Sequence, residues 1–428
     1  MDVSEGLEGV PEGYVLKLEK ALYGLKQAGR QWYQTLRDAM KEFGMKRIES
    51  DPHTFIIMKK VKGKNMILII PVYIDDLFPF GNKELVADFE EWIPKYFETS
   101  PPCDAHYFLG IRVTRNRNPP TGRPYIALDQ SNFAGNILIT VPQLFQNREV
   151  TNRKTVLPAK PIVPNPQSKN LADKSYIRKF QSAVGQLMYI MLATRPELSY
   201  PVGILARHAS NPLSQHEDAL FHLLGYLAYT IDDTLIFRKD RENKDNPGIM
   251  DCYSDADWAG EEHSGRSTSG MINIKNGAAI SWGSKRQGVV STSTMEAEYI
   301  ALFSTTQNAV WLSSLENQFH LETIKSPEPY TPNVYCDNEA ALTVARGGDM
   351  SSFKRSRFMN IKYHYVRHVV ETSEIDLHQI ESEENVADLF TKRLNKKTLT
   401  HLKGFFMEAY SKRELEDESE DKSSSDSE

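Results

Sequence analysis

The order of strand and helix patterns between Met250 and Lys403 constrains the fold of this chain most. An apolar run ends in SDADWAG, and the next reads MINIKNGAAISW, in which Asn276-Gly277 is a strong hairpin signal. A long helical pattern, STSTMEAEYIALFSTTQNAVWLSSLENQF, follows, and then the strand NVYCDN, a helix, a strand and a short helix. This order predicts an α/β domain with a mixed sheet.

The composition permits a packed protein of several domains in a reducing compartment. A length of 428 residues suggests two to four domains, and 40% hydrophobic residues are enough for packed cores. The three cysteines lie far apart without a CxxC pair, which argues against a disulfide framework or a zinc site. No apolar run approaches the ~18 residues of a membrane span. The acidic, glycine-rich N-terminus is unlike a secretory signal.

The net charge of -6 is concentrated at the end of the chain. Residues 414–428 read ELEDESEDKSSSDSE and contain no apolar residue after Leu415, so we expect a disordered, solvating tail there. The remaining chain is close to neutral. The charge therefore neither demands nor excludes a nucleic acid partner.

Proline-rich and polar stretches suggest where the chain divides. Prolines dominate residues 157–169, which predicts a linker, and polarity peaks at residues 238–248, which predicts a boundary. Between them, Tyr176 to Ile236 is predicted to be mostly helical. The predicted division is 1–140, 141–245, 246–403 and a C-terminal segment, 404–428.

Carboxylates stand at the ends of several predicted elements in the last block. The candidates are Asp255, Glu296, Asp337 and Asp388. Carboxylates forced together repel one another and cannot all ionise unless cations neutralise them. Two Mg²⁺ ions ~3.5–4 Å apart do so, and hold the attacking and leaving oxygens of a phosphodiester in line.

Ordered motifs in this block are similar to the RNase H domain of copia-type retrotransposons. They are YSDADWAG, SGRSTSG, ISWGSK, STSTMEAEY, VYCDN, YHYVRH and NVADLFTK. The resemblance covers nearly the whole block. It implies hydrolysis of RNA in an RNA–DNA hybrid, with these four carboxylates as ligands of Mg²⁺, or of Mn²⁺ in its place.

Two choices arise within this set. Glu296 and Glu298 lie about 200° apart on a helix, so only one faces the metals. The family pattern selects Glu296 and leaves Glu298 a structural role. Asp257 shares a strand face with Asp255 and is kept as a second alternative.

One histidine and two substitutions bear on how the substrate would be handled. His364 matches a family histidine that would assist product release or proton handling, and helix packing is an equal alternative. Phe358 and Asn360 replace the His and Asp usual in the family.

The first block resembles the palm of a copia-type reverse transcriptase through LYGLKQAGRQWY, VYIDDLFPFG and HYFLGIRV. Asp75 and Asp76 are predicted at a hairpin tip, where carboxylates bind Mg²⁺ and the incoming triphosphate. Gly29 stands where the family has proline. Pro71 and Pro79 flank the acidic pair, although proline is disfavoured in central strands.

The polymerase site is expected to be incomplete. The third aspartate of the family precedes a stretch resembling KTAFLNG, and no such stretch follows Asp2. The chain is therefore interpreted as N-terminally truncated, without fingers and part of the palm. Residues 176–237 resemble the family's connection between polymerase and RNase H. Lys26, Trp32 and Tyr33 are candidates for template or primer contact, with core packing favoured for Trp32.

The leading hypothesis is therefore a polyprotein fragment with RNase H activity and an incomplete polymerase site. The alternatives are an inactive remnant that at most binds nucleic acid, and a fragment completed by another chain. The expected partners are an RNA–DNA hybrid and a primer–template, with self-association as an alternative and no membrane. The family implies cytoplasmic virus-like particles or the nucleus.

Overall fold

The computed structural model describes residues 17–18, 21–22, 24–61, 63–117, 124–160, 162, 172–238, 249–261, 263–323, 331–348 and 357–409. The chain forms two compact units: Met1–Cys103 with Ser314–Pro329, and Asp104–Ser313 with Tyr330–Glu428. The predicted division into 1–140, 141–245, 246–403 and 404–428 stays a prediction. The expected tail, 414–428, lies outside the described residues.

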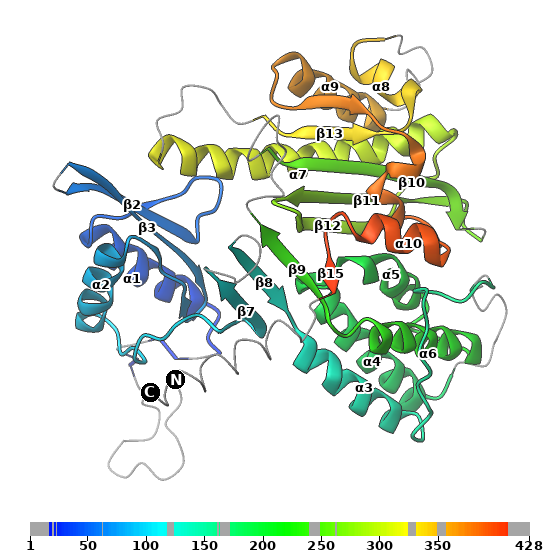
Figure 1. The fold of residues 1–428 in the computed structure, drawn as a ribbon, viewed down its shortest axis with the longest axis horizontal. Helices are drawn as coiled ribbons and strands as arrows, with labels where there is room; N and C mark the ends of the chain where they lie inside the picture. Colours follow the sequence, from blue (N-terminus) through cyan, green and yellow to red (C-terminus); the bar gives the residue numbers. More distant parts are fainter. Residues whose placement is uncertain are drawn as a thin grey trace, which may run out of the picture. The chain divides into compact units, whose positions relative to one another are not determined.

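The first unit is a small sheet with helices packed on it (Figure 1). Its strands run in the order β1-β2-β3-β4, and β5 pairs with β3. The elements are α1 (Ala28–Glu42), β1 (Lys46–Arg47), β2 (Thr54–Val61), β3 (Lys64–Tyr73), β4 (Asp76–Leu77), β5 (Phe80–Gly81) and α2 (Lys83–Trp92). Leu36 and Met40 of α1 and Phe89 of α2 pack on Leu68 and Ile70 of β3. Burial of this apolar face holds the layer together.

The hairpin expected around Asp75 and Asp76 is confirmed. Tyr73 pairs with Asp76, and Ile74 takes a left-handed φ of 54° in the turn. Pro71 is tolerated because it lies opposite Thr54, the first residue of β2, and its carbonyl still accepts from the Phe78 N–H at 3.1 Å. Pro79 falls between β4 and β5, where no ladder donor is required.

The second unit contains two sheets, the first of which is antiparallel in the order β15-β9-β8-β7-β6. Its strands are β6 (Tyr107–Phe108), β7 (Ile111–Asn116), β8 (Tyr125–Asp129), β9 (Asp233–Arg238) and β15 (Glu408–Ala409). The helices are α3 (Ser131–Leu144), α4 (Lys174–Ala193), α5 (Ser199–Arg207) and α6 (Ser214–Tyr229). The prediction that Tyr176 to Ile236 is mostly helical is confirmed. Its end differs, because DTLIFR pairs with β8 as strand β9.

The other sheet has the order β12-β11-β10-β13-β14. Its elements are β10 (Asp251–Glu261), β11 (Arg266–Lys275), β12 (Ala278–Arg286), α7 (Thr294–Thr323), β13 (Asn333–Cys336), α8 (Glu339–Ala345), α9 (Arg357–Glu371), β14 (Asp376–Gln379), the 3-10 helix Val386–Phe390 and α10 (Lys396–Lys403). Strand β10 is antiparallel to β11 and parallel to β13, so the mixed sheet is confirmed. Asn276 and Gly277 form the expected hairpin turn, with φ of 54° and 79°.

The two sheets of the second unit and the helices α4 and α6 share one hydrophobic core. Phe390 and Phe406 belong to the same buried cluster as Leu187 of α4 and Leu220 of α6. The Trp282 indole N–H of β12 donates to the Met191 carbonyl of α4 at 2.9 Å. The block from Met250 to Lys403 is therefore packed as part of a larger unit.

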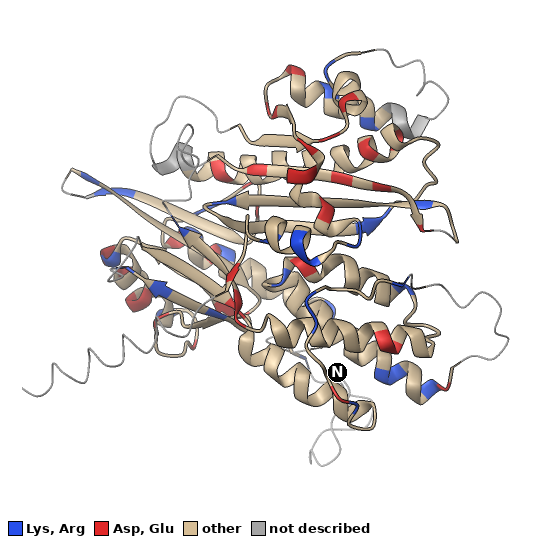
Figure 2. Ribbon diagram, turned by 45° about the vertical axis from the view of Figure 1, so that its right-hand side comes forward, with Lys and Arg blue, Asp and Glu red and all other residues tan. Residues whose placement is uncertain are grey.

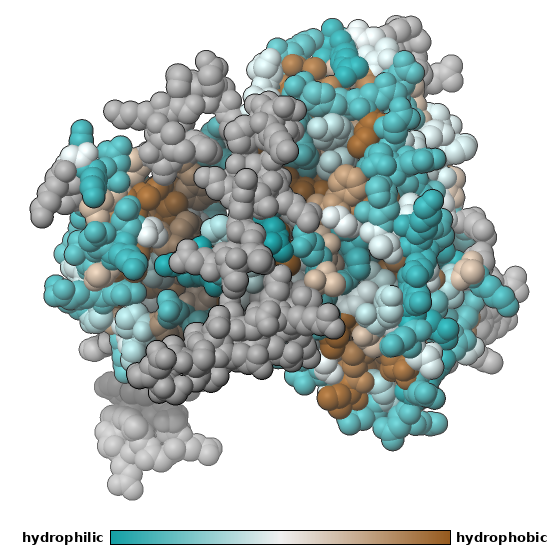
Figure 3. Space-filling view, viewed as in Figure 1, coloured by the Kyte–Doolittle hydropathy of each residue, from teal (hydrophilic) through white to brown (hydrophobic). Residues whose placement is uncertain are grey.

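Apolar side chains also reach the surface of the second unit. Figure 3 shows hydrophobic residues exposed over the region of α3, where the Ile139 side chain is 60% exposed. None of the helices that the structure describes is long and apolar enough to cross a membrane.

Candidate metal centre

Asp255 lies near the middle of β10 and is almost completely buried, with 2% of its surface exposed. The Thr391 hydroxyl donates to its Oδ2, and the Lys392 ammonium lies 3.7 Å from the same oxygen. Burial raises the pKa of the Asp255 carboxyl, and the Lys392 charge opposes that shift. Figure 2 shows acidic positions on the strands of this sheet.

The 3-10 helix Val386–Phe390 brings Asp388 beside Asp255. The Asn385 amide donates to the Ser254 carbonyl at 3.0 Å, and its oxygen accepts from the Ala387 N–H. Gly270, directly opposite Asp255 on β11, permits this approach, because a Cβ there would lie 2.8 Å from the Ala387 carbonyl oxygen. Burial first, and then the charge of Asp255, raise the pKa of Asp388 to about 7.

The structure corrects the choice of glutamate. Glu296, predicted as a metal ligand, turns back to the start of α7, where its Oε2 accepts from Thr292 N at 2.6 Å and Thr292 Oγ1 at 2.8 Å. The Ser293 hydroxyl accepts from the Glu296 N–H at 3.2 Å, so Ser293 caps the helix and the Glu296 carboxylate is held at the residue before this cap. Glu298, two residues later, is the buried glutamate that faces Asp255 and Asp337.

Glu298 lies in an environment that disfavours its negative charge. Its side chain is 5% exposed, and its Oε2 finds no hydrogen-bond partner among the described residues. Burial, followed by the charges of Asp255 and Asp337, raises the pKa of Glu298 to about 9, and a hydrogen bond from the Ala256 backbone opposes the shift. A carboxylate in this position is stabilised when a cation joins it.

Asp337 follows β13 and completes the group. Ser382 Oγ donates to its Oδ2 at 2.8 Å. One ligand atom each from Glu298, Cys336 and Asp337 lies within 4.8 Å of the others. Burial, followed by the charge of Glu298, raises the pKa of the Cys336 thiol well above its usual value, so the sulfur stays protonated and is a poor metal ligand.

The donor set fits a hard divalent cation. Carboxylate oxygens are the ligands that Mg²⁺ and Mn²⁺ prefer, and this cluster offers no thiolate. The unpartnered Oε2 of Glu298 is an oxygen that such a cation would satisfy. Among the described residues, Lys392 is the cation paired with the cluster, 2.8 Å from Asp388 Oδ1.

The remaining candidates lie around this cluster. The Asp257 carboxylate folds over Gly260 of its own strand and is half-buried, with its pKa raised by burial and then by Asp255. His364 is exposed on α9, with its ring 5.3 Å from that of Tyr363, which disfavours the helix-packing alternative. The side chains of Phe358 and Asn360 lie outside the described part of the chain.

Asp75 and Asp76 are exposed at the tip of the β3–β4 hairpin in the first unit. The Trp32 indole N–H donates to the Ile74 carbonyl at 2.9 Å, so Trp32 holds the turn and is only half-buried. Tyr33 likewise has a structural contact, with its hydroxyl donating to the Pro52 carbonyl at 2.7 Å. Asp2 lies outside the described residues, so the expected absence of a third carboxylate stays a prediction.

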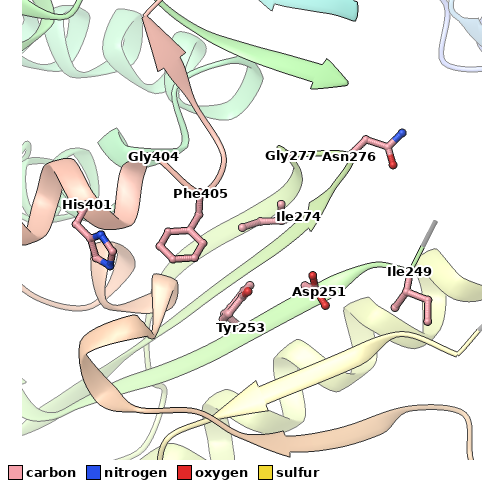
Figure 4. Close-up of a pocket in the computed structure, with 9 residues that line it drawn as sticks. All are labelled: Ile249, Asp251, Tyr253, Ile274, Asn276, Gly277, His401, Gly404 and Phe405. Carbon is pink, nitrogen blue, oxygen red and sulfur yellow. The ribbon is translucent and has the colours of Figure 1, made fainter. Parts of the chain in front are cut away.

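A cavity of about 460 Å³ opens at the start of β10 (Figure 4). Its lining includes Asp251, Tyr253, His401 and Phe405. Asp251 is four residues from Asp255, about 13 Å along an extended strand. The cavity is therefore separate from the carboxylate cluster.

Known proteins with a similar sequence place the chain in a family. The family of reverse transcriptases (RNA-dependent DNA polymerases) matches residues 6–156. The retrovirus-related Pol polyprotein from transposon TNT 1-94 of Nicotiana tabacum is 32% identical over 401 residues, 92% of this chain. That from transposon RE1 of Arabidopsis thaliana is 31% identical over 390 residues, 90% of this chain. The chain belongs to the retrotransposon Pol polyproteins.

This Pol chain spans only 28% and 24% of the lengths of those two relatives. A shorter relative, secreted RxLR effector protein 161 of Plasmopara viticola, is 46% identical over 134 residues, which are 31% of this chain and 91% of that protein. Among solved structures, the Pol chain resembles LC11-RNase H1 in complex with an RNA/DNA hybrid, with 16% identity and a TM-score of 0.24. That match covers 33% of this chain and 93% of the other.

Proposed function

We propose that this Pol chain hydrolyses the RNA strand of an RNA–DNA hybrid at a site that holds two Mg²⁺ ions, or Mn²⁺ in their place. The observation that carries the proposal is the convergence of four carboxylates from separate elements. They are Asp255 of β10, Glu298 of α7, Asp337 after β13 and Asp388 of the 3-10 helix. Such a cluster is costly to bury unless cations neutralise it, which favours a functional role over a structural one.

The residues of the chain would position the ions and the scissile phosphate. Bound Mg²⁺ would supply Lewis-acid chemistry and a water of lowered pKa. Thr391 fixes one oxygen of Asp255, Ser382 fixes one oxygen of Asp337, and the Ala256 backbone fixes one of Glu298. These contacts hold ligand oxygens in place before substrate arrives, so little reorganisation is required during the reaction.

The test is a paired assay on one preparation of the full chain. A labelled RNA–DNA hybrid with Mg²⁺ should be cleaved, and Asp337→Asn should lower the cleavage rate by several orders of magnitude, about the loss seen when one member of a catalytic group is removed. Asp376→Asn, an exposed aspartate on β14, is the matched control and should cleave as the wild type does. Cleavage unchanged in Asp337→Asn would refute the assignment of the site.

We do not expect the same preparation to extend a primer. Asp75 and Asp76 supply two carboxylates at an exposed turn, and positioning of the triphosphate requires more of the palm than a hairpin tip. Robust extension of a primed template would refute this half of the proposal. A second candidate function, nucleic acid binding without catalysis, would be favoured if the folded chain binds the hybrid and leaves it uncut. The family alone suggests cytoplasmic particles or the nucleus as the place of action.

A further inference from the structure

Lys392 is placed between two of the carboxylates that would hold metal. Its Nζ lies 2.8 Å from Asp388 Oδ1 and 3.7 Å from Asp255 Oδ2. The residue follows the 3-10 helix, one turn after Asp388, and its backbone N–H donates to the Asp388 carbonyl at 3.2 Å. The backbone thus delivers the ammonium group to the cluster.

An ordinary surface ion pair would be the simpler interpretation, and such pairs contribute little. Two observations separate Lys392 from that case. Both partners are buried, with the Asp255 side chain 3% and the Asp388 side chain 11% exposed. Among the described residues, no other Lys or Arg forms an ion pair with either of them.

We propose that Lys392 is an internal counter-ion that occupies the cation position between Asp255 and Asp388 and must leave it before one of the two metal ions binds there. The inference rests on the proposed metal site. The Lys392 side chain is 40% exposed, so its flexible stem has open space on one side into which the ammonium moves. The lysine stabilises the metal-free cluster and weakens its affinity for one ion.

This role has two consequences of opposite sign. Without metal, removal of Lys392 leaves buried carboxylates without their cation, so the variant unfolds at a lower temperature than the wild type in EDTA. With metal, the variant has no ammonium to displace, so it binds Mg²⁺ more tightly, by about tenfold at one site, a coupling typical of two competing ligands.

The experiment is a calorimetric Mg²⁺ titration of the full chain, together with thermal unfolding in EDTA and in Mg²⁺. The variants are Lys392→Met, with Lys392→Gln as a second form if the first folds poorly. Lys396→Met is the matched control, because it removes the same charge from an exposed position at the start of α10. It corrects for the general effect of a more negative chain.

Glu298→Gln separates failure of this inference from failure of the proposed function. If the wild type and Glu298→Gln bind Mg²⁺ equally, the metal site itself is wrong. If Glu298→Gln loses binding, and Lys392→Met binds no more tightly than Lys396→Met, the site stands and the counter-ion role is overturned. Tighter binding in Lys392→Met, with lower stability in EDTA and a difference that disappears in Mg²⁺, would support the role.

Discussion

Replacement of Glu298 by glutamine should stabilise the metal-free protein, although it removes a proposed ligand. The pKa of Glu298 is raised to about 9 from an ordinary value of 4.5. The folded state therefore retains a proton that the unfolded state releases, and stability falls as the pH rises between these two values. Glutamine is neutral and of similar shape, so it escapes this loss.

The magnitude follows from the interval between the ordinary pKa and the working pH. At pH 7 that interval is about 2.5 units, and each unit corresponds to roughly 1.4 kcal/mol, which gives a gain of the order of 3 kcal/mol. Glu298 is almost fully buried, so solvent screens little of this cost. At pH 4, where the carboxyl is protonated in both states, the gain should vanish.

The assay is thermal or urea unfolding of the full chain in EDTA at pH 4, pH 7 and pH 8.5, repeated in Mg²⁺. Glu296→Gln is the matched control on the same helix, and it should lose at most about 1 kcal/mol through its weaker cap. Its response to Mg²⁺ should match that of the wild type. Glu298→Gln should lose most of the Mg²⁺ response.

Two results would refute the reasoning. One is a Glu298→Gln chain that is less stable than the wild type in EDTA at pH 7. The other is loss of the Mg²⁺ response in Glu296→Gln and not in Glu298→Gln, which would restore the original choice of glutamate.

Two further predictions concern packing around the site. Gly270→Ala should lower the free energy of unfolding by about 1–3 kcal/mol and weaken Mg²⁺ binding, because the added Cβ would meet the Ala387 backbone. Gly283→Ala is the control and should cost little stability, because its nearest neighbour is the flexible end of the Met271 side chain. Equal losses of stability in the two variants would contradict this. Arg195→Met should cost about 3–5 kcal/mol of stability in urea unfolding, because it leaves the fully buried Glu197 without its ion-pair partner at 2.7 Å. Replacing Glu197 by Leu as well should recover part of this stability. If the double variant recovers none, the loss does not come from an unpaired charge.

The local elements could largely be predicted from the sequence, because their signals are local. Asn276-Gly277 marks a turn with two left-handed residues, and alternating apolar runs mark the strands on either side. The acidic pair at Asp75 follows a buried strand in the same way. In each case the residues that decide the conformation lie within a few positions of one another.

The choice between Glu296 and Glu298 required a different signal from the one used. Helical geometry showed that only one could face the site, and a family pattern then selected the wrong one. The spacing Ser293-x-x-Glu296 is the signature of a helix cap, and it assigns Glu296 to the helix start. Applied to the sequence, that local rule predicts that Glu298, and not Glu296, faces the carboxylate cluster.

The pairing of strands far apart in the sequence could not be predicted, because it depends on contacts between distant segments. Strand β9 pairs with β8 about a hundred residues earlier, and β15 pairs with β9 from near the end of the described chain. Neither pairing leaves a trace in local composition.

The common core of the second unit determines which substitutions can disturb the carboxylate cluster. Phe390 and Phe406 belong to the same buried cluster as helices that lie some two hundred positions earlier in the chain. A destabilising substitution in α4 or α6 would therefore disturb the segment that carries the carboxylate cluster, without changing a carboxylate. Substitutions that would disrupt the proposed metal site can therefore fall anywhere in the second unit. For the same reason, an excised fragment that begins at Met250 would expose apolar surface and tend to aggregate, whereas one that begins at Asp104 retains the complete core.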